Sequence, residues 1–185
     1  MYKIMFNNIL ISMLISSTIA FTPSPKIKTF RYVGSTKPLD NFDPLNILKN
    51  KSENRVKFTR EAELQHGRLA MLATLSIPFL EHLDKHSSVL GINYLSSMDL
   101  YHQAPFWLGA TCYETLRMGR GWTNPFTTNT TFNLLENYQP GNVGNYDMSK
   151  VEDSFLNKEL NNGRLAMIAF MGILAQELVT GNPIF

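Results

Sequence analysis

The chain has 185 residues, of which 44% are hydrophobic, with 17 lysine and arginine residues against 15 aspartate and glutamate residues. This near balance of charge gives no electrostatic basis for binding nucleic acid, and the length fits one domain once a leader is removed. Cys112 is the only cysteine, which excludes an internal disulfide and any metal site built from cysteines. If the protein lies in a membrane, its spans must be few and partly polar.

The N-terminal segment has the composition of a targeting leader. In residues 1–20, Lys3 precedes a short apolar run and small residues end at Ala20, which predicts a signal peptide. The apolar run is shorter than the roughly 20 residues that a membrane span needs. Residues 21–39 contain basic residues, serine and threonine but no acidic residue, and they resemble a plastid transit peptide. Together the two segments resemble the bipartite leader of algae with complex, red-derived plastids.

Three helices are predicted in the mature domain, which comprises residues 40–185. The first helix covers about 59–83, roughly 37 Å at the usual rise per residue, so it can cross a bilayer at a tilt. The second is built on the apolar run 104–118, and residues 119–144 read as a loop. The third covers about 151–180 and is followed by a Gly-Asn-Pro stop signal. Taken alone, the first helix fits a soluble helix bundle equally well.

A nine-residue segment occurs twice, at an offset of 96 residues (159 − 63). The copies at 63–71 (Glu-Leu-Gln-His-Gly-Arg-Leu-Ala-Met) and 159–167 (Glu-Leu-Asn-Asn-Gly-Arg-Leu-Ala-Met) differ only at their third and fourth positions. At the same offset, Glu81 falls on Glu177. The copies lie in the first and third helices, so with one span between them these helices are predicted to be parallel, around a pseudo-twofold axis. Lysine and arginine cluster on one side of this three-span arrangement, which supports it.

Each copy carries a glutamate and an arginine within apolar sequence, where an unpaired charge is expensive. Glu63 and Arg68 are separated by about 140° around one helix, which is poor geometry for pairing. A twofold arrangement instead pairs Glu63 with Arg164 and Glu159 with Arg68. Loss of either arginine would then leave a glutamate unpaired, and Gly67 on the contact face would let the helices approach closely.

The same helices carry possible metal ligands. A carboxylate neutralised by arginine keeps lone pairs on its second oxygen, and His66 or Asn162 follows the glutamate after three residues. Gln176 lies about four turns beyond Asn162 on a similar face. These ligands are separate, whereas a bare ion needs several that converge. They suit a magnesium ion that a macrocycle already holds and that takes one axial ligand from the protein.

This pattern resembles the three-helix chlorophyll-binding light-harvesting antenna proteins, of the fucoxanthin–chlorophyll a/c or red-lineage type. The resemblance extends over about residues 40–182. It implies an all-α membrane protein with three transmembrane helices, of which the first and third form a crossed pseudo-twofold pair. It also implies chlorophyll a, chlorophyll c and xanthophyll carotenoids as cofactors, with no catalytic residues. The implied location is the thylakoid membrane, among its lipids, other antenna subunits and a photosystem I or II core.

The resemblance implies roles for individual residues. The implied magnesium ligands are Glu63, His66, Glu114, Glu159, Asn162 and Gln176, and the implied helix-crossing ion pairs use Arg68 and Arg164. Asp43, Pro44 and Leu45 are expected beside a carotenoid, as is Asp147 in a degenerate second copy of that segment. Phe106 occupies a position where some relatives carry a glutamine ligand, so that ligand is absent here.

Two other functions fit parts of the sequence. Di-iron carboxylate helix bundles use a Glu-x-x-His motif twice, and Glu63-x-x-His66 supplies one copy. The other copy has Asn162 instead of histidine, and two core arginines would oppose a dication, so this enzyme is the remote alternative. A photoprotective protein that dissipates excitation needs the same ligands as an antenna, and it stays open beside light harvesting.

Overall fold

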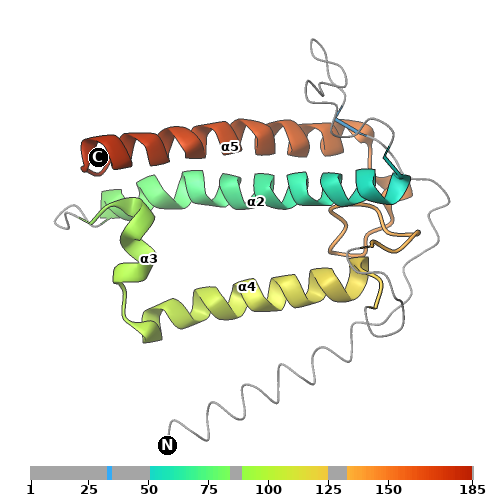
Figure 1. The fold of residues 1–185 in the computed structure, drawn as a ribbon, viewed down its shortest axis with the longest axis horizontal. Helices are drawn as coiled ribbons and strands as arrows, with labels where there is room; N and C mark the ends of the chain where they lie inside the picture. The colour runs from blue at the N-terminus through green and yellow to red at the C-terminus, as the bar shows by residue number, and fades with distance from the viewer. Residues whose placement is uncertain (1–32, 35–50, 84–88, 125–132, 185) are drawn as a thin grey trace, which may run out of the picture.

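In the computed structural model, the residues that the structure describes are 33–34, 51–83, 89–124 and 133–184. They form the long helices α2 (Glu53–Leu83), α4 (Leu100–Gly121) and α5 (Asp153–Thr180), and the short helices η1 (Gly91–Asn93), α3 (Tyr94–Ser97) and η2 (Met148–Lys150). Helices α2 and α5 lie side by side and run in the same direction, whereas α4 runs in the opposite direction on the other side of α2 (Figure 1). The predicted signal peptide and nearly all of the predicted transit segment lie outside the described residues.

Helix α2 begins earlier than the sequence predicted. It starts at Glu53 rather than near Thr59. This first part is polar and therefore carries no apolar signal, but it is stabilised locally. Lys57 pairs with Glu53 at 3.0 Å, one turn away, and the N–H of Arg55 donates to the carbonyl of Ser52 at 3.0 Å. The helix then continues through Pro78 to Leu83.

Helix α4 is longer at both ends than the predicted 104–118. Its first turn, from Leu100, is polar, and the carbonyl of Asp99 accepts from the N–H of Gln103 at 3.1 Å. Its last residues, up to Gly121, include glycines that resemble a loop in the sequence. Helix α5 agrees closely with the prediction and ends at Thr180. Gly181 forms its C-cap, with a left-handed φ of 65° and an N–H bond to the carbonyl of Glu177.

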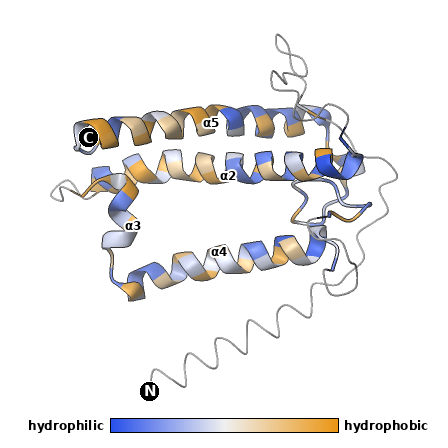
Figure 2. Ribbon diagram, in the orientation of Figure 1, coloured by the Kyte–Doolittle hydropathy of each residue, from blue (hydrophilic) through white to orange (hydrophobic). Residues whose placement is uncertain are grey.

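The long helices differ in hydropathy (Figure 2). Among the described residues, α5 is the one helix that is long and apolar enough to cross a membrane on those criteria. Apolar side chains nevertheless cover the outer faces of both members of the pair. Leu72 and Leu75 on α2 are 68% and 74% exposed, and Ile168 and Met171 on α5 are 72% and 63% exposed. Such faces need an apolar covering. The expectation of three membrane spans thus has direct support from α5 alone.

The centre of the fold is the contact between α2 and α5. At the closest point, glycine faces glycine: a Cβ added to Gly67 would lie 3.0 Å from Cα of Gly163. Ala70 and Ala166, at equivalent positions one turn further on, are also buried. These small residues let the backbones approach until the side chains beside the crossing can reach the opposite helix.

A second contact closes the far ends of α2 and α5, where η1 packs against them. The repeat-related Glu81 and Glu177 are buried there, 5% and 0% exposed. Glu81 accepts hydrogen bonds from the N–H groups of Gly91 (3.0 Å) and Ile184 (2.9 Å), and Glu177 accepts one from Ile92 (3.1 Å). The two carboxylates therefore hold η1 and the C-terminal residues against the helix pair.

Candidate functional site

The charged residues of the repeat form two crossed ion pairs where α2 and α5 meet. Arg164 Nε lies 2.7 Å from Glu63 Oε1, and Arg68 Nε lies 2.7 Å from Glu159 Oε1. The structure thus brings together the residues that the sequence paired across the twofold axis. All four side chains are between 27% and 38% exposed, so a ligand outside the helix pair can reach them.

The two glutamates differ in how their oxygens are used. Glu63 Oε2 also accepts a hydrogen bond from Nη1 of the buried Arg60, at 2.6 Å. The equivalent position in the second half (60 + 96 = 156) is Leu156. Within the described residues, no hydrogen bond occupies Glu159 Oε2. Glu159 therefore has a whole oxygen free for a ligand, whereas Glu63 has only its remaining lone pairs. Arg60 lies outside the repeated segment, so the repeat does not reveal its role.

His66 and Asn162 both lie exposed on the outer faces of their helices. His66 Nδ1 lies 2.7 Å from the backbone carbonyl oxygen of Ala62. A carbonyl can only accept, so a hydrogen bond here requires the proton on Nδ1, and this tautomer has its lone pair on Nε2. A backbone partner on one imidazole nitrogen and a free second nitrogen is the arrangement of a histidine metal ligand.

The other two predicted ligands lie away from the crossing. Glu114 on α4 is exposed, and Arg117 donates to its Oε2 through Nε at 3.0 Å. Gln176 is exposed on the second half of α5. Among the described residues, no three histidine, cysteine, aspartate or glutamate side chains come close enough to hold a metal ion. The donor set consists of separate single ligands, which fits several preformed metal complexes that each need one axial ligand.

Helix α4 is tied to α2 by polar side chains that the repeat does not reveal. The Tyr113 hydroxyl donates to Gln65 Oε1 at 2.7 Å and accepts from Arg68 Nη1 at 3.3 Å. Closer to the end of α4, Arg117 Nη1 lies 3.4 Å from Oε1 of Glu61, which is only 2% exposed. These contacts lie in the second half of α4, towards its C-terminal end.

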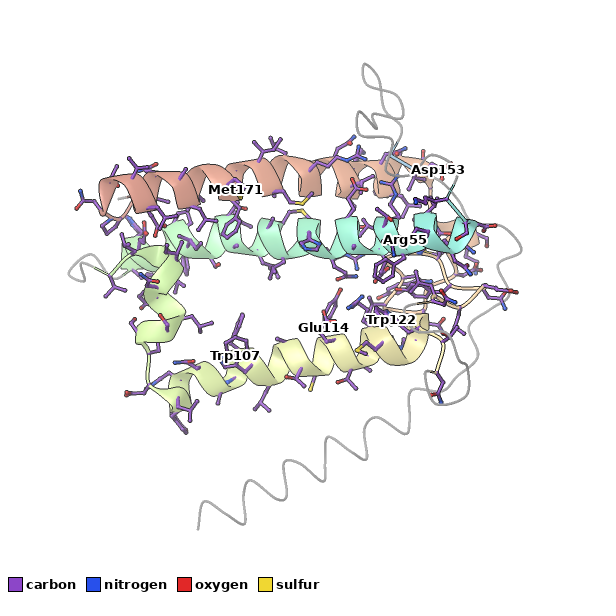
Figure 3. All side chains as sticks on the ribbon, in the orientation of Figure 1. Arg55, Trp107, Glu114, Trp122, Asp153 and Met171 are labelled. Atoms are coloured by element: carbon purple, nitrogen blue, oxygen red, sulfur yellow. The ribbon has the colours of Figure 1, made fainter. Side chains whose placement is uncertain are left out.

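Large apolar side chains in the first half of α4 remain exposed among the described residues. Figure 3 shows Trp107 on the side of α4 that faces α2, and this tryptophan is still 52% exposed. Phe106 and Leu108 beside it are 49% and 38% exposed. Trp107 therefore presents aromatic surface towards α2 that the described side chains leave about half exposed (Figure 3).

Asp147 lies where η2 begins. The hydroxyl and the N–H of Ser149 donate to its Oδ1 at 2.6 and 3.1 Å, and these bonds hold the pKa of Asp147 below its usual value. Nearby, a cavity of about 310 Å³ lies between α2, α5 and the loop 139–148, with Tyr146 and Met148 in its wall. Asp43, Pro44 and Leu45, expected beside a carotenoid, lie outside the described residues.

Comparison with known proteins gives consistent matches. The model of the family described as chlorophyll A-B binding protein matches residues 31–178. The chain is 38% identical over 164 residues to the chloroplastic fucoxanthin-chlorophyll a-c binding protein of Isochrysis galbana, a match that covers 80% of this chain and 77% of that protein. It is 37% identical over 170 residues to the chloroplastic light-harvesting complex stress-related protein 1 of Chlamydomonas reinhardtii, covering 82% of this chain and 66% of that protein. A fucoxanthin-chlorophyll a-c binding protein of Chattonella marina var. antiqua is 30% identical over 155 residues, covering 80% of this chain and 69% of that protein.

Proposed function

Because the chain belongs to the chlorophyll A-B binding protein family, a light-harvesting and chlorophyll-binding family, we propose that its exposed polar side chains hold chlorophylls one by one. The proposed magnesium ligands are Glu63, His66, Glu114, Glu159, Asn162 and Gln176. Each would supply one oxygen or nitrogen ligand to the magnesium ion of a chlorophyll. The bound chlorophylls absorb light and pass excitation onward, and the protein fixes their spacing without catalysing a reaction.

The observation that carries this proposal is the pair of glutamates neutralised by arginine across the α2–α5 crossing. A free carboxylate in an apolar environment would be expensive, whereas Glu159 beside Arg68 forms a neutral pair with Oε2 still open. The lone pair on Nε2 of His66 points to the same chemistry with a neutral ligand. Both features serve an axial bond without placing a net charge beside the magnesium.

The proposal includes three membrane spans formed by α2, α4 and α5 of a domain at residues 40–185. The exposed apolar faces of α2 and α5, and the exposed aromatic residues of α4, would be covered by pigments and by thylakoid lipids. The pigments would be chlorophyll a, chlorophyll c and xanthophylls. We place the protein in the thylakoid of a complex red-derived plastid, reached through the bipartite leader, beside other antenna subunits and a photosystem I or II core.

Carotenoids belong to the same proposal. The cavity beside Asp147 is lined by residues of α2, of α5 and of the segment between α4 and α5. It has the size and the mixed lining that the polar end ring of a xanthophyll needs. On the pseudo-twofold pattern, Asp43, Pro44 and Leu45 would form the corresponding end of a second groove.

A direct test is to refold the full chain with chlorophylls a and c and xanthophylls. His66→Leu and Asn162→Leu should each remove a single chlorophyll while the helix content is kept, because each removes an axial ligand and no ion pair. Asn161→Leu is the matched control, since Asn161 is exposed beside Asn162 but is not a proposed ligand. Pigment extraction and the absorption spectrum give the readout. Unchanged chlorophyll content in both ligand variants would contradict the proposal, as would iron without chlorophyll in the purified protein.

A photoprotective role is the second candidate function. The stress-related protein of Chlamydomonas reinhardtii matches this chain at 37% identity, almost as well as the fucoxanthin-chlorophyll protein of Isochrysis galbana at 38%. The proposed ligands serve both roles, so the fluorescence lifetime of the isolated pigment–protein separates them. A lifetime near that of free chlorophyll indicates an antenna, and a much shorter one indicates dissipation.

A further inference from the structure

A loop glycine lies against the Arg68 side of the α2–α5 crossing. The N–H of Gly141 donates to Glu61 Oε2 at 2.6 Å, and its carbonyl accepts from Arg68 Nη2 at 2.9 Å. Through its Nε, the same guanidinium donates to Glu159 Oε1 at 2.7 Å. A chain of hydrogen bonds therefore runs from Glu61 through the glycine and the arginine to the glutamate.

A second loop glycine repeats this arrangement on the other side. The N–H of Gly34 donates to Asn157 Oδ1 at 2.7 Å, and its carbonyl accepts from Arg164 Nη1 at 2.9 Å. Arg164 Nε then donates to Glu63 Oε1 at 2.7 Å. Asn157 and Glu61 are equivalent in the repeat (157 − 61 = 96), so the two hydrogen-bond chains are related by the pseudo-twofold axis.

Both positions require glycine. Gly34 and Gly141 have φ angles of +99° and +86°, which side chains rarely adopt. A Cβ on Gly141 would lie 2.9 Å from Leu64 Cδ1, and a Cβ on Gly34 would collide with Leu160 Cδ2. Leu64 and Leu160 are again equivalent positions (160 − 64 = 96). The glycines themselves are 107 residues apart (141 − 34), so the sequence repeat does not relate them.

We propose that Gly34 and Gly141 are positioning residues that keep the glutamates of the crossed pairs available as magnesium ligands, an inference that rests on the proposed chlorophyll function. A guanidinium is planar, and without a second acceptor it can turn two parallel N–H groups onto both oxygens of a carboxylate. Each glycine carbonyl accepts from one terminal nitrogen and so fixes the orientation in which the arginine bonds to the glutamate through Nε. On Arg68, Nη1 also donates to the Tyr113 hydroxyl. Arg68 thus neutralises Glu159 without covering its Oε2, whereas Oε2 of Glu63 also accepts from Arg60 and keeps only its remaining lone pairs.

The test uses the full chain refolded with chlorophylls a and c and xanthophylls. Gly141→Ala should at least halve the chlorophyll bound at Glu159. The reference for that site is the charge-neutral double variant Glu159→Leu with Arg68→Leu, which defines the lost absorption band in a low-temperature difference spectrum. Gly172→Ala is the matched control, because a Cβ there has nothing within 4 Å. A purely structural role would weaken all bands together, whereas a positioning role removes the band of the reference variant.

The Gly34 side gives the companion measurement, with Glu63→Leu plus Arg164→Leu as its reference. If Gly34→Ala does not assemble, Asn157→Leu removes the acceptor that holds the glycine without straining the backbone. Asn157→Leu should lose the absorption band that the Glu63→Leu plus Arg164→Leu double variant loses. Asn157→Asp should retain this band, because aspartate keeps an acceptor oxygen for the N–H of Gly34.

The outcomes of the two measurements are distinguishable. Double variants that lose no chlorophyll would overturn the proposed ligands themselves. A different result is that the double variants lose their absorption bands while Gly141→Ala and Asn157→Leu keep those same bands. That result, or an equal loss of all bands in Gly141→Ala and Asn157→Leu, would overturn the positioning role alone.

Discussion

The two arginines of the repeat are equivalent in sequence but not in their surroundings. Arg164→Leu leaves Glu63 with Arg60, whose Nη1 is 2.6 Å from its Oε2. This corrects the expectation from the sequence that either loss would leave a glutamate unpaired. Arg68→Leu leaves Glu159 without a cation among the described residues, and it also removes a donor from Tyr113.

We therefore predict that Arg68→Leu prevents assembly while Arg164→Leu only reduces it. A charge without a partner at the centre of a membrane helix costs about 2.5–3.5 kcal/mol on insertion scales. The yield of pigment-bound protein on a density gradient measures the difference. Combining Arg60→Leu with Arg164→Leu should lower the yield to that of Arg68→Leu. Equal yields of the two single variants would refute the asymmetry.

At the residue scale, the repeat was sufficient to pair Glu63 with Arg164 and Glu159 with Arg68, because charge in an apolar helix has few solutions. Arg60 and Glu61 lie just before the repeated segment, where basic and acidic residues read as an ordinary polar helix start. Only the folded chain shows that both are buried.

At the scale of the helix, the crossing point is the most sensitive position. Gly67→Ala places a Cβ 3.0 Å from Cα of Gly163, and backbone cannot move aside as a side chain can. The helices must separate, and the crossed pairs at 2.7 Å must lengthen. We predict a lower midpoint for thermal release of chlorophyll, although alanine alone favours a helix by about 1 kcal/mol. Gly172→Ala should leave the midpoint for thermal release of chlorophyll unchanged. An equal decrease of the midpoint in Gly172→Ala would exclude a specific effect at the crossing.

The helices themselves were predictable where apolar periodicity and stop signals agree. The end of α5 at Thr180 follows from the Gly-Asn-Pro sequence after it, because Gly181 adopts the left-handed cap. The two ends of α4 were not predictable from the sequence, because its first turn is polar and its last turn contains glycines. In both cases local hydrogen bonds, rather than hydropathy, extend the helix.

At the scale of the whole molecule, Glu61 connects α2 to both α4 and the loop after it. Besides Arg117, it accepts from the N–H of Gly141 at 2.6 Å and from the hydroxyl of Tyr138 at 3.3 Å. Burial raises the pKa of Tyr138, and the nearby carboxylate raises it further, so this hydroxyl remains a donor.

Glu61→Leu should therefore loosen α4 and the chlorophyll that we assign to Glu114. Removing one partner of a buried charged network costs about 3–5 kcal/mol. Thermal release of pigment, followed at the band that Glu114→Leu removes, measures the effect. Glu152→Leu is the control, because Glu152 is exposed and its side chain caps nothing. An unchanged midpoint for Glu61→Leu would show that α4 is held by other contacts.

The common direction of α2 and α5, with α4 running the opposite way, followed from the repeat, since two parallel copies joined by one helix require it (Figure 1). The attachment of α4 to α2 could not be predicted from the repeat, because Tyr113 and Gln65 are common residue types with no periodic signal. The polar residues that serve the crossing and this attachment also lower the hydropathy of α2 and α4. This is why, among the helices that the structure describes, α5 alone resembles a membrane span by composition.

The crossed pairs also constrain the order in which the protein can be completed. Arg164 and Glu63 are 101 residues apart in the chain, and Arg68 and Glu159 are 91 apart. A chain that ends before α5 contains Arg68 but not the carboxylate that neutralises it. With α2 in the membrane, as proposed, such a fragment would carry an arginine in lipid without the carboxylate that neutralises it. Addition of the last helix would then complete the neutral pairs on which pigment binding depends.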